Sequence, residues 1–268
     1  MRGGPVVTGN GTDYSAQATG TLSKATGTFA HVKSGITEEG QIDDTGPQVT
    51  NAFTLQLNSQ FFSDPPACKK APVPSECSGW QQFVYAFDYS GDTNEVFMQY
   101  WLLYYDTTCP KGWDTYSTDG YTFCYANSPA TAFGSLPANA LGHTTFIGQA
   151  ASGGSDTVSL SSTSGASSVS NKDSQLDLSK YWNTTEWGVF GDAGGGQANF
   201  GARSTLEPIT TLQGTSSSAP TCVEEGFTGE TNNLSFTKTK ALKTESLPTM
   251  ATTQTEGKVK TPSCQVAS

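Results

Sequence analysis

Apolar and polar residues alternate along several short segments of the chain. Over residues 53–57, Phe and Leu alternate with Thr and Gln. Successive side chains of a β-strand point to opposite faces, so this period of two predicts a half-buried strand. A second strand is predicted at residues 80–87, and the polar composition of residues 88–94 predicts a turn after it.

Residues 95–105 give the strongest strand pattern in the chain. Both alternating sets of positions carry large apolar or aromatic side chains, and Gln99 is the only side-chain amide among them. Strands that are apolar on both faces are typical of the interior of a sheet. We therefore expect a central strand that is covered on both sides.

Shorter segments of similar composition follow, separated by turns rich in Gly, Ser and Pro. They predict strands at residues 121–125, 144–150, 157–161, 186–190 and 205–212, and one helical turn at residues 175–182. No repeat of about 20–50 residues is present, which argues against a propeller or a β-helix. The pattern predicts an all-β fold, an antiparallel β-sandwich of the concanavalin-like or jelly-roll type.

Composition changes along the chain and suggests three regions. Residues 1–50 are rich in Gly and Thr and predict an extended N-terminal arm with one edge strand near residues 28–32. Residues 51–236 hold the strand patterns and are expected to form the sandwich domain. Residues 237–268 are rich in Thr and Lys and predict a loosely ordered C-terminal tail pinned by Cys264.

The composition and charge of the chain limit the kinds of partner that we expect it to bind. The chain has 5 Trp, 10 Tyr and 14 Phe, enough aromatic residues for a sizeable core. Its formal net charge of -10 would repel a phosphate backbone, so we expect no nucleic-acid partner. No run of about 18 apolar residues occurs, so we expect no membrane partner either. A monomer is expected.

The six cysteines form an even set, for which 15 disulfide pairings exist. Their sequential spacing favours the pairs Cys68–Cys77, Cys109–Cys124 and Cys222–Cys264. With only two histidines and no C-x-x-C motif, we expect no metal site and no cofactor. Disulfides favour an oxidising compartment, and N-x-S/T sequons at Asn10, Asn183 and Asn233 are in keeping with a secreted glycoprotein.

Carboxylate and amide chemistry remain as the candidate chemistry, because the chain has no G-x-S-x-G motif. Glu186 begins a predicted strand next to Trp187, and an apolar wall would raise the pKa of its carboxyl. Such a group can act as a general base in an acidic medium. Gln99 could donate a hydrogen bond to the oxyanion that forms on an attacked carbonyl. The two are therefore candidate catalytic residues.

The residues around these two candidates resemble a known family. Trp80, then Phe97-Met98-Gln99 followed by aromatic residues, and later Glu186-Trp187-x-Val189 resemble the glutamic peptidases, or eqolisins. These are secreted acid endopeptidases with a concanavalin-like sandwich. The resemblance implies a hydrolase in which a glutamate at position 186 activates water and a glutamine at position 99 stabilises the oxyanion.

Residues near the two candidates are expected to contact the substrate, which would be a polypeptide. They are Trp101, Trp187, Asp192 and Tyr105. Two alternatives remain open. The five tryptophans and many amides would also suit an extracellular glycan-binding, lectin-like protein or a polysaccharide-cleaving sandwich. The Thr-rich ends would suit a structural or interaction protein of the extracellular surface.

Overall fold

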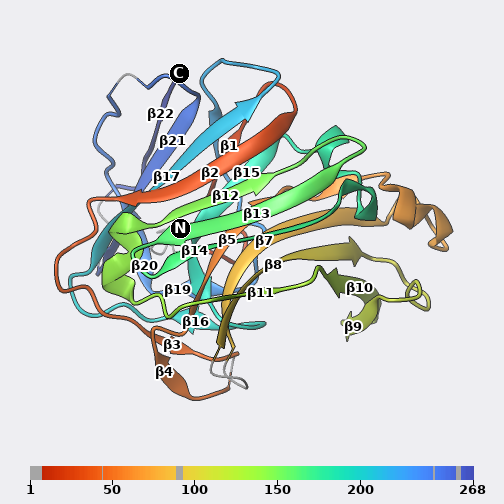
Figure 1. Ribbon diagram of the computed structural model, residues 1–268, viewed down its shortest axis with the longest axis horizontal. Coiled ribbons are helices and arrows are strands. Elements are labelled where there is room, and N and C mark those ends of the chain that lie inside the picture. The colour runs from red at the N-terminus through yellow and green to blue at the C-terminus, as the bar shows by residue number, and fades with distance from the viewer. Residues whose placement is uncertain (1–7, 44, 89–92, 244, 258–260) are drawn as a thin grey trace, which may run out of the picture.

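A computed structural model describes residues 8–43, 45–88, 93–243, 245–257 and 261–268 (Figure 1). Two large antiparallel sheets stack on each other, and a small third sheet lies at one end of the stack. The structure confirms the predicted all-β sandwich. Its helices are short 3₁₀ turns: η1 (Pro66–Lys70), η2 (Ala138–His143), η3 (Asp173–Gln175) and η4 (Leu178–Lys180).

The first sheet has the strand order β18-β1-β15-β5-β7-β8-β10-β9, with β6 beside β7 and β11 beside β8. Its strands are β1 (Tyr14–Gln17), β5 (Phe53–Ser59), β6 (Phe62–Ser63), β7 (Ser78–Asp88), β8 (Thr93–Leu103), β9 (Asp114–Thr118), β10 (Tyr121–Asn127), β11 (Thr131–Phe133), β15 (Thr184–Gly191) and β18 (Thr221–Glu224). The predicted central strand is β8, which lies inside this sheet.

The second sheet has the order β14-β13-β12-β2-β17-β21-β20, with β22 beside β21. Its strands are β2 (Leu22–Ala30), β12 (Thr145–Gln149), β13 (Ser155–Ser162), β14 (Gly165–Lys172), β17 (Thr205–Gly214), β20 (Leu234–Thr237), β21 (Thr249–Glu256) and β22 (Cys264–Ala267). The small third sheet consists of β19 (Thr231–Asn232), β16 (Gln197–Ala198), β3 (Glu39–Gln41) and β4 (Gln48–Thr50).

The strand register places one row of large apolar side chains on the inner face of the first sheet. Trp187 on β15 lies opposite Leu57 on β5, which lies opposite Phe83 on β7, which lies opposite Met98 on β8. All four are at most 2% exposed. Because side chains alternate along a strand, their neighbours in sequence point to the outer face.

Glycines in the second sheet make room for these rings. A Cβ added to Gly27 on β2 would lie 2.2 Å from the ring of Trp187, and one added to Gly148 on β12 would lie 2.6 Å from the ring of Phe83. The Trp187 ring also packs against Phe146, with ring centroids 5.5 Å apart. The core therefore fits large rings from one sheet against small residues of the other.

The N-terminal region differs from the extended arm that composition predicts. The expected edge strand near residues 28–32 belongs to β2, which is an interior strand between β12 and β17. Its hydrophobicity is low because two of its buried positions are the small residues Ala25 and Gly27.

The C-terminal region also differs from the expected loose tail, because β20, β21 and β22 extend the second sheet. Threonine hydroxyls contact each other across β17 and β21, as between Thr205 and Thr255 at 3.0 Å. Uncharged polar strands of this kind lack the apolar alternation on which the sequence prediction relied.

All three disulfides predicted from spacing are confirmed. Cys68–Cys77 and Cys109–Cys124 close short loops, and Cys222–Cys264 joins β18 of the first sheet to β22 of the second. The last bond therefore links the edges of the two sheets.

The close fit at Gly27 leads to a stability prediction. Gly27→Ala should lower the free energy of unfolding by about 1–3 kcal/mol, because the new methyl group overlaps the Trp187 ring. Calorimetric melting measures the loss. Gly194→Ala is the matched control, since no atom lies within 4 Å of the Cβ position there. Equal melting temperatures for the two variants would contradict the proposed close packing.

Candidate functional site

A row of polar side chains lies on the outer face of the first sheet, directly beside the apolar row of the inner face. Glu186 on β15, Asn58 on β5, Gln82 on β7 and Gln99 on β8 lie opposite one another, and Asn127 on β10 continues the row. Figure 1 shows the central strands of this sheet, β5, β7 and β8, side by side. We call these five residues the amide row.

Hydrogen bonds tie the first half of the amide row together. Asn58 Nδ2 donates to Glu186 Oε2 at 2.7 Å, and Gln82 Nε2 donates to Asn58 Oδ1 at 3.2 Å. Gln56, two residues before Asn58, accepts from both amides at its Oε1, at 3.1 Å and 3.0 Å. The amides are buried, and these bonds satisfy groups that would otherwise lose their water partners.

A tryptophan connects the second half of the row. Trp101 Nε1 lies 3.0 Å from Gln82 Oε1 and 2.8 Å from Gln99 Oε1 and donates to both. Gln99 Nε2 donates to Asn127 Oδ1 at 3.0 Å. A side-chain amide has two N–H donors. The second N–H of Gln99 therefore remains for a ligand, as judged from the contacts of the described residues.

Glu186 lies at one end of the row and is fully buried. Burial raises the pKa of its carboxyl to about 7, although the hydrogen bonds from Asn58 and from the backbone of Phe227 and Thr228 favour the charged form. The N–H of Phe227 donates to Glu186 Oε1 at 3.3 Å. A Cβ at Gly226 would lie 3.0 Å from the same oxygen, so this glycine lets the segment at residues 226–230 close over the carboxyl.

Two further carboxyls, Asp13 and Glu230, lie close to Glu186. Burial, followed by the charge of Glu186, raises the pKa of Asp13 well above its usual value. Burial also raises the pKa of Glu230, and the charge of Glu230 in turn raises that of Glu186. Glu230 accepts a hydrogen bond from Thr228 Oγ1, and its Oε2 lies 3.5 Å from Gln56 Nε2.

A groove of about 440 Å³ runs along the same outer face. Its lining residues are Ile42, Thr54, Gln56, Gln82, Val84, Ala86, Phe87, Glu95, Phe97, Gln99, Asp192, Ala193 and Glu230. Glu230 is thus the member of the carboxyl cluster that reaches the groove, and Glu186 lies behind it. An extended polar chain laid in the groove would meet carboxyls and amides.

The structure places the two predicted catalytic residues on the same face and in the same row, but not on adjacent strands. Glu186 is on β15 and Gln99 is on β8, with β5 and β7 between them. Three strand spacings amount to about 14 Å. Side-chain amides of the row fill the space between them. Asp192, a predicted substrate contact, lines the groove, and Trp101 faces outward beside Gln99.

Two other predicted substrate contacts lie in the core instead. Trp187 is 2% exposed and donates from Nε1 to the carbonyl oxygen of Thr28 at 3.1 Å on the facing sheet. Tyr105 is also 2% exposed and belongs to the same core. Neither is among the residues that line the groove. Trp187 follows Glu186 directly, so strand alternation turns its side chain inward.

Sequence reasoning missed Asp13, Glu230 and the amides Gln56, Asn58 and Gln82. The amides carry a readable signal, because Gln56 and Asn58 occupy alternate positions of one strand where a solvent-facing strand would more often carry charged residues. Asp13 and Glu230 lie outside the strands, and only the fold brings them to Glu186. No periodicity marks them.

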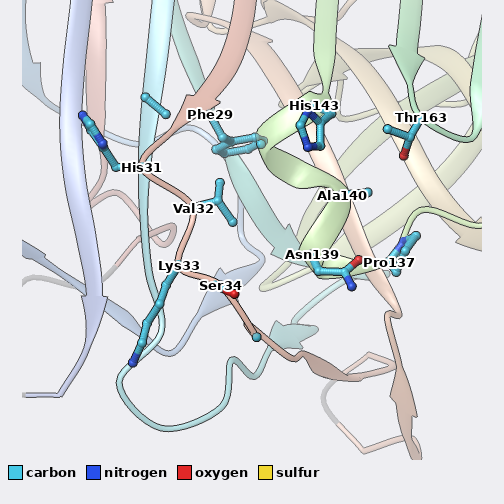
Figure 2. A pocket seen from close by; sticks show the side chains of 13 residues that line it. Phe29, His31, Val32, Lys33, Ser34, Pro137, Asn139, Ala140, His143 and Thr163 are labelled. Atoms are coloured by element: carbon cyan, nitrogen blue, oxygen red, sulfur yellow. The ribbon is translucent and has the colours of Figure 1, made fainter.

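A separate cavity of about 630 Å³ contains both histidines of the chain. Figure 2 shows His31 and His143 well apart, on either side of Phe29 in that view. Among the described residues no group of three or more His, Cys, Asp or Glu side chains could hold a metal ion. In the same part of the chain, no helix is long and apolar enough to cross a membrane.

Comparisons with known proteins show a distant structural likeness. No protein-family model and no curated protein matches the chain. Among solved structures, it is similar to the crystal structure of scytalido-glutamic peptidase with a peptide-based transition-state analogue, at a TM-score of 0.39 and 11% sequence identity. The match covers 93% of this chain and 100% of that one. A likeness at this level assigns neither a fold nor a function.

The buried carboxyls predict how stability depends on pH. Burial raises the pKa of Glu186 and of Asp156 to about 7 and that of Glu38 to about 8, above the values in an unfolded chain. The folded protein therefore binds more protons than the unfolded chain between about pH 4 and pH 8. Stability should be highest below about pH 4 and should fall progressively, by a few kcal/mol in total, as the pH rises from about 4 to about 8. Thermal melting across this range measures the fall.

Asp156→Asn is the informative variant for this prediction. It replaces one buried carboxyl by an amide that does not ionise, so its melting temperature should fall less steeply with pH. Glu224→Gln changes an exposed carboxyl and should follow the parent curve. A melting temperature that rises from pH 4 to pH 8 in the parent protein would rule out protonated carboxyls as the cause.

Proposed function

We propose that the protein is an acid hydrolase that cleaves polypeptide chains, with Glu186 and Glu230 as its acid–base pair. The observation that carries the proposal is the placement of two buried carboxyls, Glu186 and Glu230, at one end of a hydrogen-bonded amide row beside an open groove. The pattern of residues around Gln99 and Glu186, which resembles that of the glutamic peptidases, supports a peptide as substrate.

The two carboxyls supply the proton transfers that hydrolysis requires. Because like charges repel in a buried site, the pair holds one proton over a range of pH while the other carboxyl is ionised. The ionised carboxyl takes a proton from water as the water oxygen bonds to the carbonyl carbon. The protonated one then gives its proton to the amide nitrogen as the C–N bond breaks.

In this proposal Gln99 binds the substrate chain at a distance from the cleaved bond. The roughly 14 Å between β15 and β8 corresponds to about four residues of an extended peptide. The second N–H of Gln99 would donate to a main-chain carbonyl of the substrate. Gln99 therefore positions the substrate chain, and Glu186 and Glu230 act at the peptide bond that is cleaved.

We also propose that the protein acts outside the cell. Three disulfides are compatible with a protein that folds in an oxidising compartment. A moderately acidic extracellular medium would leave the pair with one proton, so that one carboxyl is protonated and the other is ionised. We therefore place the activity in a secreted protein.

The activity test uses denatured protein as substrate at acid pH. Glu186→Gln and Glu230→Gln should each lower kcat by about 10²–10⁴, because an amide cannot exchange the proton. Gln99→Ala should raise KM with a smaller change in kcat. A fall in kcat of about 10²–10³ would instead identify Gln99 as an oxyanion donor. Mass spectrometry of the released peptides measures all three.

Glu224→Gln, an exposed glutamate outside the groove, is the matched control and should keep full activity. Circular dichroism and melting confirm that each variant is folded. Folded Glu186→Gln and Glu230→Gln proteins that cleave as fast as the parent would refute the assignment of the pair. Absence of any cleavage between acid and neutral pH would refute the hydrolase itself.

A further inference from the structure

Aromatic rings form a continuous strip on the outer face of the first sheet, on the side of the amide row away from the groove. We call it the aromatic strip; its members are Trp80, Trp101, Tyr116, Phe123, Tyr104 and Tyr121. They come from β7, β8, β9, β10 and the residue that follows β8. Figure 1 shows that β9 and β10 lie at the far end of this sheet.

Each ring of the aromatic strip touches the next. Ring centroids are 6.2 Å apart for Trp80 and Trp101, 6.2 Å for Trp101 and Tyr116, and 6.1 Å for Tyr116 and Phe123. Tyr104 then lies 5.1 Å from Phe123 and 5.1 Å from Tyr121.

The outer rings of the strip remain open to solvent. Tyr104, Tyr116 and Tyr121 are 43%, 51% and 48% exposed. Large exposed aromatic groups that lie together on one face commonly mark a binding surface.

The strip is held rigid by its own strands. β9 pairs with β10 over five residue pairs from Asp114↔Tyr125 to Thr118↔Tyr121, and β10 pairs with β8. The disulfide Cys109–Cys124 anchors the chain just before β9 to β10. The rings are therefore ordered before a ligand arrives, which lowers the entropy cost of binding.

Two further rings, Phe61 and Phe227, connect the strip to the segment that covers Glu186. Phe61 contacts Trp80 with a centroid distance of 5.3 Å and contacts Phe227 at 5.5 Å. The backbone N–H of Phe227 is the group that donates to Glu186. A long ligand lying on the strip would thus have one end close to the segment at Phe227 that covers Glu186.

The chemistry of this surface selects a neutral ligand rich in hydroxyl groups. None of the six strip residues is charged, and the net charge of -10 disfavours an anionic polymer. Flat exposed rings stack on the C–H faces of sugar rings, and tyrosine hydroxyls can bond to sugar hydroxyls at the ring edge. Gln99 and Asn127 of the amide row add hydrogen-bonding groups along the inner side of the strip.

We propose that the aromatic strip binds a neutral polysaccharide chain, which lies across β8, β10 and β9 and is held by ring stacking. This binding function goes beyond the proposed hydrolase and does not require it. A protein with both would be retained on a glycan-rich surface while its carboxyl pair acts on a chain in the groove.

The test is retention of the full protein on insoluble and soluble polysaccharides. Cellulose, chitin and a soluble β-1,3-glucan serve as neutral probes, and polygalacturonate serves as the acidic probe. We expect retention on at least one neutral probe and none on polygalacturonate. The double variant Tyr116→Ala/Tyr121→Ala should weaken retention about tenfold or more, because two stacking surfaces are lost.

Three control proteins separate stacking from other causes. Tyr116→Phe/Tyr121→Phe keeps both rings and should keep most of the retention. Leu247→Ala removes an exposed apolar side chain outside the strip and should leave retention unchanged. Glu186→Gln should be retained like the parent even if it has lost hydrolysis, so the two proposals can fail separately.

Three results would overturn the glycan proposal. The first is the absence of retention on every neutral probe, and the second is retention that the double alanine variant leaves unchanged. The third is a dimer in sedimentation experiments that the double alanine variant abolishes, because the strip would then be covered by a second copy of the chain.

Discussion

Buried polar groups need hydrogen-bond partners, and in this protein the strand register supplies them. Glu186, Asn58 and Gln82 are buried on the outer face of the first sheet, where an unpaired amide or carboxyl would cost free energy. Because β15, β5 and β7 are in one register, each of these side chains lies opposite the next and bonds to it. A shift of one residue would turn the amides into the core and Leu57 outward. The apolar row of the inner face and the amide row of the outer face are therefore fixed together.

The carboxyl cluster depends on the same register and on one additional segment. Strands β1 and β15 bring Ser15 opposite Glu186, and Asp13 lies just before β1. The segment at residues 226–230 then closes over Glu186 through Gly226 and Phe227. This segment brings Glu230 to the groove and the Phe227 ring to Phe61, which contacts Trp80 of the aromatic strip. One short stretch of chain thus joins the two surfaces for which we propose functions.

The sequence predicts those features that depend on local alternation. The strand at residues 95–105, the sandwich class and the disulfide pairs follow from apolar periodicity and cysteine spacing, and the structure confirms them.

The outer face of β8 differs from expectation, because Trp101 and its neighbours are half-buried in a surface strip and not fully covered. Periodicity reports which side chains share a face, but not whether another layer lies on that face. Strand β2 was expected at an edge because its small residues look weakly hydrophobic. A small residue such as Gly27 belongs to the core here because the facing sheet provides the large ring of Trp187.

The buried carboxyls of the site have no cationic partner, in a chain that is acidic overall. Among the described residues, no lysine or arginine forms an ion pair with Asp13, Glu186 or Glu230, and the single ion pair recorded there joins Lys180 to Asp177. A buried carboxylate without a cation is unfavourable, so these groups are held as acids until the pH is high enough to ionise them. Each ionisation then adds negative charge to a chain whose formal net charge is already -10. A cluster of this kind, without a neutralising cation, is most stable in a medium acidic enough that at most one of its members is ionised, because each further ionisation would destabilise the sheet that holds them.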